Sequence, residues 1–190
     1  SSQEAISIAE EIGYPVVLKI ASADISHKTD VSGVLVGLKD QEAIKKGFLE
    51  ITSRAQRLRP EAHISGCLVQ EMAPKGAKEI IIGFTRDPQF GPLIMFGLGG
   101  VYVEILKDIA FRLAPLTRRD AKEIIREIQT FLLLKGVRGE PSVNLKAIED
   151  IILSMSQIAL DFPEVLEAEF NPVLVNPEKA IIADVRLTLE

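Results

Sequence analysis

Apolar residues recur every three or four positions along four stretches of the chain, which is the spacing of amphipathic helices. These positions are Ala5, Ile8, Ala9 and Ile12; Ile44, Phe48, Ile51, Ala55 and Leu58; Ala121, Ile124, Ile125, Ile128, Phe131 and Leu132; and Leu145, Ile148, Ile152, Met155 and Ile158. A polar residue that can cap a helix precedes each stretch. The caps are Ser1 or Ser2, Asp40, Thr117 (in a capping box with Asp120) and Asn144. We expect the first three helices to end at Gly13, before Pro60 and at residues 135–141.

Short apolar runs between turn signals predict the strands. The runs cover residues 16–20, 33–38, 64–72, 79–84, 93–96, 169–175 and 180–185. Turn dipeptides containing proline lie at 87–88, 91–92 and 176–177. We expect the last two strands to form a hairpin, with Asn171 at the start of one strand and Asp184 inside the other. Strands and helices in this order indicate an α+β fold.

Composition narrows the class of protein. The 190 residues are 47% hydrophobic and carry a net charge of −5. A chain of this size can bury a substantial core, and its acidity argues against nucleic acid as a main partner. Its one cysteine, Cys67, excludes an internal disulfide and fits a reducing compartment, so we expect a cytoplasmic protein with Cys67 as a small core residue. No apolar run is long enough to span a membrane, and we expect no membrane association.

Four predicted strands each contain a charged residue that needs an explanation, at Lys19, Glu71, Glu79 and Asp184. A buried charge is costly unless it is paired or binds a ligand. A lysine in an edge strand can instead extend its ammonium group into water. A glutamate on a half-buried strand face can equally be solvated. The pattern alone leaves these alternatives open.

Glycines and histidines are the other candidates for chemistry. Gly97, Gly99 and Gly100 follow an apolar run and could bring backbone N–H groups close to a phosphate. Their spacing alone favours a tight turn in which two backbones touch. His63 follows a proline-containing segment and is expected in a surface loop. His27 lies in a polar loop, where the sequence alone favours solvent exposure.

Six segments, in order, resemble the motifs of the ATP-grasp module of NDP-forming acyl-CoA synthetases. They are GYPVVLKI (13–20), SHKTDVSGV (26–34), VQEMAPKGAKEIIIG (69–83), DPQFGPLIMFGLGGVYVEILKDIAFRLAPL (87–116), KGVRGEP (135–141) and EFNPVLV (169–175). The likeness covers essentially the whole chain. It is to the β subunit of ADP-forming acetate–CoA ligase, or to the fused equivalent of that subunit.

This resemblance implies an ATP-grasp fold with the nucleotide between two α/β subdomains. The first subdomain would span residues 1–68 and the second residues 69–190. In the family, further sequence precedes the position of the first residue here. We therefore expect the N-terminal part of the fold to be missing from this chain.

The resemblance also implies roles for individual residues. The nucleotide contacts would be Lys19, Gln70, Glu71, Met72, Glu79, Gly97, Gly99, Gly100 and Arg112. Among them, Lys19 and the glycines would contact phosphates, residues 70–72 the adenine, and Glu79 the ribose hydroxyls. Asn171 and Asp184 match the metal-ligand pair, with Glu169 as a weaker candidate; the alternative for Asn171 is a residue of an Asn-Pro turn.

His27 matches the histidine that relays the phosphoryl group in this family. Ser32 stands where the family motif usually has its first glycine. The implied reaction is acyl-CoA + ADP + phosphate to acid + ATP + CoA, reversible, with ATP or ADP and Mg²⁺ as cofactors. No residues are assigned to CoA or acyl binding, so we expect these sites on an α subunit or a fused domain.

Two alternatives to a ligase remain open. One is the regulatory ATP-grasp module of a protein lysine acetyltransferase, and the other is a non-catalytic interaction module. The joint presence of Lys19, His27, Asn171 and Asp184 favours the ligase.

Overall fold

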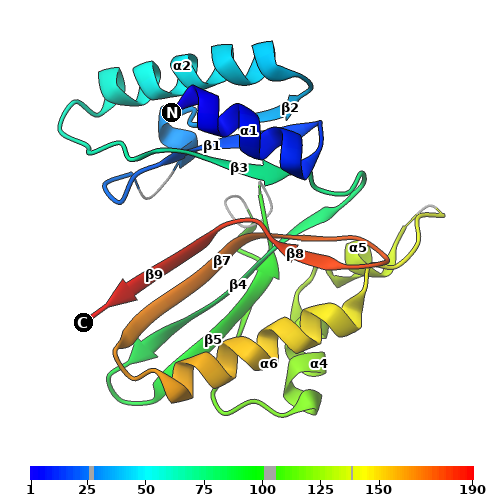
Figure 1. Cartoon of the computed structure of the whole chain (residues 1–190). Coiled ribbons are helices and arrows are strands. Elements are labelled where there is room, and N and C mark those ends of the chain that lie inside the picture. Colours follow the sequence, from blue (N-terminus) through cyan, green and yellow to red (C-terminus); the bar gives the residue numbers. More distant parts are fainter. Residues whose placement is uncertain (26–27, 101–105, 138) are drawn as a thin grey trace. The chain divides into compact units, whose positions relative to one another are not determined.

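The chain forms two compact units, Ser1–Met72 and Ala73–Glu190 (Figure 1). The structure is a computed structural model that describes residues 1–25, 28–100, 106–137 and 139–190. The division follows Met72 and not residue 68, because strand β3 (Gly66–Glu71) pairs with strand β1 (Val16–Ala21) along its whole length.

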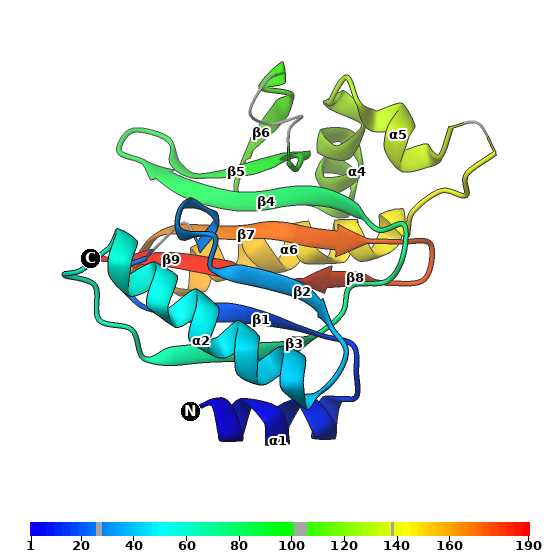
Figure 2. The same cartoon turned by 90° about the horizontal axis from the view of Figure 1, so that it is seen from above.

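The first unit is a three-stranded antiparallel sheet with helices packed on one face. Strand β1 lies in the centre, between β2 (Val34–Leu38) and β3. The helices are α1 (Ser2–Ile12) and α2 (Gln41–Leu58), both visible in Figure 2, and a 3₁₀ turn, η1, covers Lys28–Val31. Alternate β1 residues, Val16, Leu18 and Ile20, share one core cluster with both helices. Val17 and Lys19 therefore belong to the opposite face.

Helix caps in the first unit confirm the predicted starts. The Ser1 hydroxyl accepts a hydrogen bond from the Glu4 N–H in a capping box, and Asp40 accepts one from the Ala43 N–H (2.8 Å). The predicted apolar face of α1 was partly wrong. Ile6 is buried beside its neighbours in the core, whereas Ile8 is 43% exposed. Ala9 lies three residues after Ile6 and four after Ala5, so these residues can share one buried helix face.

The second unit is a larger antiparallel sheet, with strands in the order β6-β5-β4-β7-β8 and β9 also paired with β7. Figure 2 shows β5, β4, β7 and β9 side by side. The strands are β4 (Lys78–Asp87), β5 (Gly91–Leu98), β6 (Ile109–Leu113), β7 (Val165–Val175), β8 (Ala180–Ile182) and β9 (Val185–Leu189). The turn predicted between β4 and β5 is confirmed: the Asp87 carboxylate accepts the N–H groups of Gln89 and Phe90.

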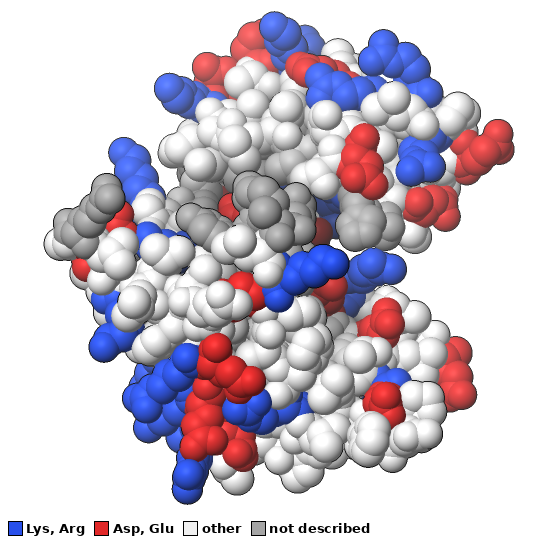
Figure 3. All heavy atoms as spheres, turned by 180° about the vertical axis from the view of Figure 1, so that it is seen from behind, with Lys and Arg blue, Asp and Glu red and all other residues white. Residues whose placement is uncertain are grey.

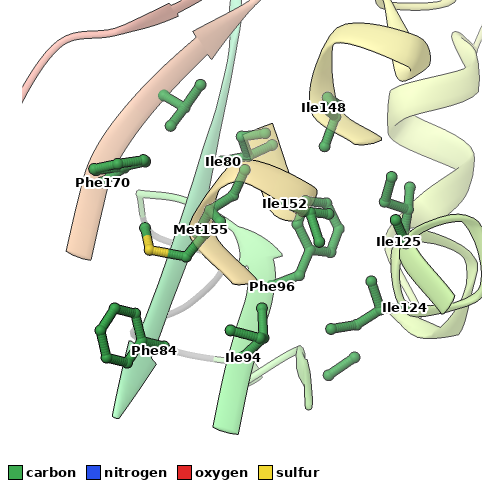
Figure 4. Packing of buried hydrophobic residues seen from close by; sticks show 14 of the residues in the cluster. Ile80, Phe84, Ile94, Phe96, Ile124, Ile125, Ile148, Ile152, Met155 and Phe170 are labelled. Atoms are coloured by element: carbon green, nitrogen blue, oxygen red, sulfur yellow. The ribbon is translucent and has the colours of Figure 1, made fainter. Parts of the chain in front are cut away.

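Three helices, α4 (Arg118–Glu127), α5 (Phe131–Lys135) and α6 (Leu145–Asp161), accompany this sheet. Ile124 from α4, Ile152 from α6 and Phe96 from β5 meet in its core (Figure 4). The predicted caps Thr117 and Asn144 are confirmed. A single helix through Leu132 was wrong, because Ile128 adopts an extended conformation and ends α4.

Two strand predictions also need correction. Strand β6 was not predicted, since Arg112 interrupts its short apolar pattern and the charged Lys107 and Asp108 directly precede it. The expected strand 180–185 is two strands, β8 and β9, and Asp184 lies in the break between them. Both strands still pair with β7. Among the described residues, none of the helices combines the length and the apolar character that crossing a membrane requires.

Candidate nucleotide and metal site

One face of the second sheet is packed against helices, and most of the candidate residues of this unit lie on the other face. Along β4, Ile80, Ile82 and Phe84 point into the helix-covered core. Glu79 and every second residue after it face the opposite side, because successive side chains of a strand alternate between its two faces. We call this opposite side the open face.

Glu79 and the glycines after β5 lie together. The backbone N–H of Gly99 donates a hydrogen bond of 2.7 Å to the carbonyl oxygen of Glu79. A Cβ atom on Gly99 would lie 3.2 Å from the Glu79 carbonyl carbon, closer than nearly all real Cβ contacts. Gly100 has φ +64, and its Cβ position is 3.2 Å from Glu79 Oε2. The glycines therefore let backbone approach the Glu79 carboxylate.

Gly97 occupies a different kind of position. It lies within β5, paired with Ile81 on one side and Ile109 on the other. A Cβ there would lie 2.8 Å from Ile109 Cγ2 and 3.0 Å from the Asp108 carbonyl oxygen. Close packing within the sheet thus explains this glycine without a ligand.

Asn171, Asp184 and Glu169 meet where β7 faces the break between β8 and β9. The Asn171 N–H donates to the Asp184 carbonyl oxygen (3.1 Å). The Asn171 side-chain nitrogen donates to Glu169 Oε1 (3.0 Å), which leaves its amide oxygen as an acceptor without a described partner. Glu169 is half-buried and Asn171 exposed.

These three side chains fit a hard divalent cation. Carboxylate and amide oxygens are the donors Mg²⁺ prefers, and Mg²⁺ usually takes only one or two protein ligands besides water and phosphate oxygens. In the described part of the chain, no three His, Cys, Asp or Glu residues form a metal-binding group. The donor set therefore suits an ion that shares its coordination with a bound phosphate better than an all-protein metal centre.

Arg112 does not lie with these candidate metal ligands. It pairs across the sheet with the core residue Ile94 and forms an ion pair with Glu127 of α4 (2.5 Å). Its side chain is thus engaged on the helix-covered side. Its expected role at the nucleotide stays a prediction.

The first unit places Lys19 and Gln70 on the same sheet face. Lys19 is only 8% exposed and lies in the central strand, so the edge-strand alternative for this lysine was wrong. Gln70 is the cross-strand partner of Val17, on the face that also carries Lys19. Glu71, the last residue of β3, is exposed, and Met72 Sδ accepts a hydrogen bond from the Gly37 N–H (3.3 Å).

His27 and Ser26 lie outside the described residues, so the structure does not place the expected relay histidine. The flanking turn η1 is described, and it begins at Lys28. His63 is exposed, as expected, in a loop held by a hydrogen bond from its N–H to Asp24 (2.7 Å).

The sequence analysis missed Arg186 and Asp108. Arg186 is the cross-strand partner of Glu169 on the open face. A basic residue two positions after Asp184 could have indicated it, since such residues share a strand face. Asp108 is 5% exposed and accepts hydrogen bonds from the N–H groups of Gln129 and Thr130, both 2.8 Å.

Basic and acidic side chains are interspersed on the face of the molecule in Figure 3, as on a solvated surface.

Comparison with known proteins identifies the family of this chain. Residues 1–189 match the family model described as an ATP-grasp domain. The chain is 46% identical to subunit beta of acetate–CoA ligase [ADP-forming] I from Pyrococcus furiosus, over 100% of this chain and 81% of that subunit. It is 50% identical to acetate–CoA ligase [ADP-forming] I from Archaeoglobus fulgidus over 98% of this chain, but spans only 27% of that longer protein.

The solved structures give the same result. The dinucleotide-forming acetyl-coenzyme A synthetase 1 of Ca. Korarchaeum cryptofilum, in complex with coenzyme A, Ca-AMPCP and HgCl+, matches with a TM-score of 0.96 and 45% identity, over 100% of this chain and 82% of that chain. A second structure of that enzyme, with coenzyme A and Mg-AMPPCP, has its phosphohistidine segment pointing towards the nucleotide-binding site (TM-score 0.85, 42% identity, 100% and 83% covered). The chain therefore belongs to the ATP-grasp family and is a homologue of the β subunit of ADP-forming acetate–CoA ligases.

Proposed function

We propose that this chain is the nucleotide-binding, phosphoryl-transferring part of an ADP-forming acid–CoA ligase. The complete enzyme would convert acyl-CoA, ADP and phosphate to acid, ATP and CoA, reversibly. The observation that carries the proposal is the order of groups along the open face. Glu79 with Gly99 and Gly100 lies at one level of the sheet, and Asn171 with Asp184 at the next.

That order matches the order of parts in a nucleotide. The Glu79 carboxylate can accept hydrogen bonds from two vicinal ribose hydroxyls. The adjacent glycines allow a ligand to approach backbone closely. Asn171 and Asp184, further along the same face, would hold Mg²⁺, which when bound neutralises phosphate charge and bridges phosphate oxygens.

Residues of the first unit would complete the site. We propose that the Lys19 ammonium contacts nucleotide phosphates, because it is a positive charge on a strand of the first unit and matches the phosphate-contacting lysine of the family. Residues 70–72 would contact the adenine. The test for Lys19 is Lys19→Ala, which should weaken ADP binding at least tenfold while thermal unfolding stays cooperative; unchanged affinity would remove Lys19 from the site.

His27 is proposed as the phosphoryl carrier. Its imidazole nitrogen would attack the γ-phosphorus of ATP, forming an N–P bond as the bond to the β–γ bridging oxygen breaks and ADP leaves. The reverse step would make ATP. The phosphohistidine segment of the Korarchaeum enzyme supports a carrier of this type.

The acyl and CoA chemistry would require a partner. The relatives include both a separate β subunit and a protein of which this chain spans about a quarter. We propose a CoA-binding α subunit or a fused equivalent domain, and a cytoplasmic location. All these relatives are named as ligases, which favours a ligase over a regulatory acetyltransferase module.

Calorimetric titration of ADP with and without Mg²⁺ tests the proposal. Wild-type protein should bind ADP more tightly with Mg²⁺. Asn171→Ala and Asp184→Ala should each raise the Mg²⁺ requirement, and the double variant should be less than additive because both side chains hold one ion. Asp161→Ala, on the last turn of α6, is the matched control. Equal ADP affinity with and without Mg²⁺ in wild type and in the three metal-site variants would refute the metal assignment.

A further inference from the structure

A groove runs along the open face beyond the candidate metal residues. Its volume is about 200 Å³, and all of its lining belongs to the second unit. Polar groups from three strands face it: Thr85 of β4, Glu167 and Glu169 of β7, and Arg186 and Thr188 of β9. Met95 and Phe111 form its apolar side.

Strand register fixes where this groove lies relative to the other groups. Glu79 pairs with Leu174, Ile81 lies opposite the bulge at Asn171, and Gly83 pairs with Glu169, which pairs in turn with Arg186. Each step of two residues advances about 6–7 Å along the strands. Three successive positions along one sheet face therefore carry, in order, the expected ribose contact, the metal residues and Arg186. We call these positions the first, second and third level.

Arg186 is the cation at the third level. It is exposed, and it makes no hydrogen bond or ion pair with any residue that the structure describes. Glu169 lies directly across the strand pair from it, yet its carboxylate accepts from Asn171 instead. By contrast, Arg112 and Arg86 on the same sheet are both engaged by protein groups.

A phosphate chain that starts at the ribose and passes the metal would place its terminal phosphoryl group at this third level. That group carries the charge that changes during transfer. A planar guanidinium can donate two parallel hydrogen bonds to phosphoryl oxygens. Glu167 and Glu169 also face the groove, so the positive charge of Arg186 and of a bound metal would have to offset their repulsion of an anion.

We infer that Arg186 binds the transferred phosphoryl group. This inference rests on the proposed function. In the transfer to His27, Arg186 would hold the γ-phosphoryl oxygens while the bond to the leaving ADP breaks and the N–P bond forms. The same position would serve the phosphoryl group of phosphohistidine when ADP attacks it.

Comparing two nucleotides in one binding assay tests the inference. In Arg186→Met, Mg-ADP should bind as in wild type, because ADP ends at the metal level. The non-hydrolysable triphosphate AMPPCP, with Mg²⁺, should bind about tenfold more weakly, since it loses a charge-assisted contact. Arg186→Lys should recover part of the AMPPCP affinity. Arg119→Met, an exposed arginine on α4, is the control and should change neither affinity.

The outcomes separate the two claims. If wild-type protein binds neither nucleotide, the proposed function fails. If wild type binds both and Arg186→Met weakens neither, the proposed function stands and the role of Arg186 is refuted. Equal weakening of ADP and AMPPCP would also refute it, because it would place the arginine at a phosphate that both nucleotides share.

Discussion

The guanidinium of Arg86 on β4 donates a hydrogen bond of 2.8 Å to the carbonyl oxygen of Phe162, the residue that follows α6. It also donates to the carbonyl oxygens of Ala159 (2.6 Å) and Val165 (2.8 Å), and lies 5.6 Å from the centre of the Phe84 ring. The last carbonyl groups of a helix have no partner within the helix. One arginine from the sheet therefore satisfies the end of α6 and fixes that helix to β4.

Replacing this arginine should destabilise the second unit. Arg86→Met should lower the free energy of unfolding by roughly 2–4 kcal/mol, because three carbonyl groups lose a charged donor. Urea unfolding followed by circular dichroism measures the change. Arg119→Met removes an ion pair to Glu123 on the surface of α4, and solvent screening should make its effect on the free energy of unfolding much smaller. Equal effects of the two substitutions would contradict the role of Arg86.

The contact between Gly99 and Glu79 gives a second prediction. Gly99→Ala should displace Glu79 by a few tenths of an ångström and weaken ADP binding on the order of tenfold, because small misplacements at a site are costly. Gly47→Ala is the matched control: the closest contact of its Cβ would be the end of the Leu35 side chain, at 2.9 Å. It should leave ADP affinity unchanged. Calorimetric titration of both variants with ADP measures the two affinities. Unaltered ADP affinity in Gly99→Ala would remove Glu79 from the nucleotide site.

Asp108 gives a prediction about pH. Burial works to raise the pKa of this carboxyl, but the Thr130 hydroxyl and the N–H groups of Gln129 and Thr130 outweigh it and hold the pKa below its ordinary value. A lowered pKa stabilises the fold above the unfolded-state pKa of about 3.9, and this stability is lost as pH falls through the folded-state value.

Asp108→Asn should therefore unfold at lower urea concentration than wild type at pH 7, by roughly 1–3 kcal/mol. The gap should close as the pH is lowered below about 4. Parallel urea titrations between pH 3 and 7 measure it. A gap that does not change with pH would show that the carboxylate charge is not what stabilises this contact.

Cys67 provides a chemical test of burial. Its side chain packs at the margin of the first core, and burial raises the pKa of the thiol to about 11. Because the thiolate is the reactive form, iodoacetamide at pH 8 should modify the native protein roughly 100-fold more slowly than protein unfolded in urea. Mass spectrometry reads the result at a single site, since the chain has one cysteine. Equal rates would show that Cys67 is not protected.

The sequence predicted most elements that depend on local signals. Helix caps such as Asp40 and Thr117, and the turn at Asp87, depend on hydrogen bonds to backbone N–H groups two or three residues away. The local sequence is therefore enough to predict them. Strand β6 and the break at Asp184 were not predicted, because pairing with strands distant in the sequence determines where these strands form and end. Glu79, Asn171 and Asp184 were predicted from family motifs, whereas pairing across β7 and β9 was needed to see Arg186 beside Glu169.

The pairing of β4 with β7 has a consequence for how the second unit folds. Residues 88–164 separate these strands along the chain, yet Ile80 lies opposite Val173. Closing so long a loop is entropically costly, and contacts of this separation tend to form late. The hairpin of β4 and β5 can form first, but it lacks the carboxylate and amide oxygens expected to bind the metal. Nucleotide-dependent protection of this unit should therefore arise only after β7 has paired with β4.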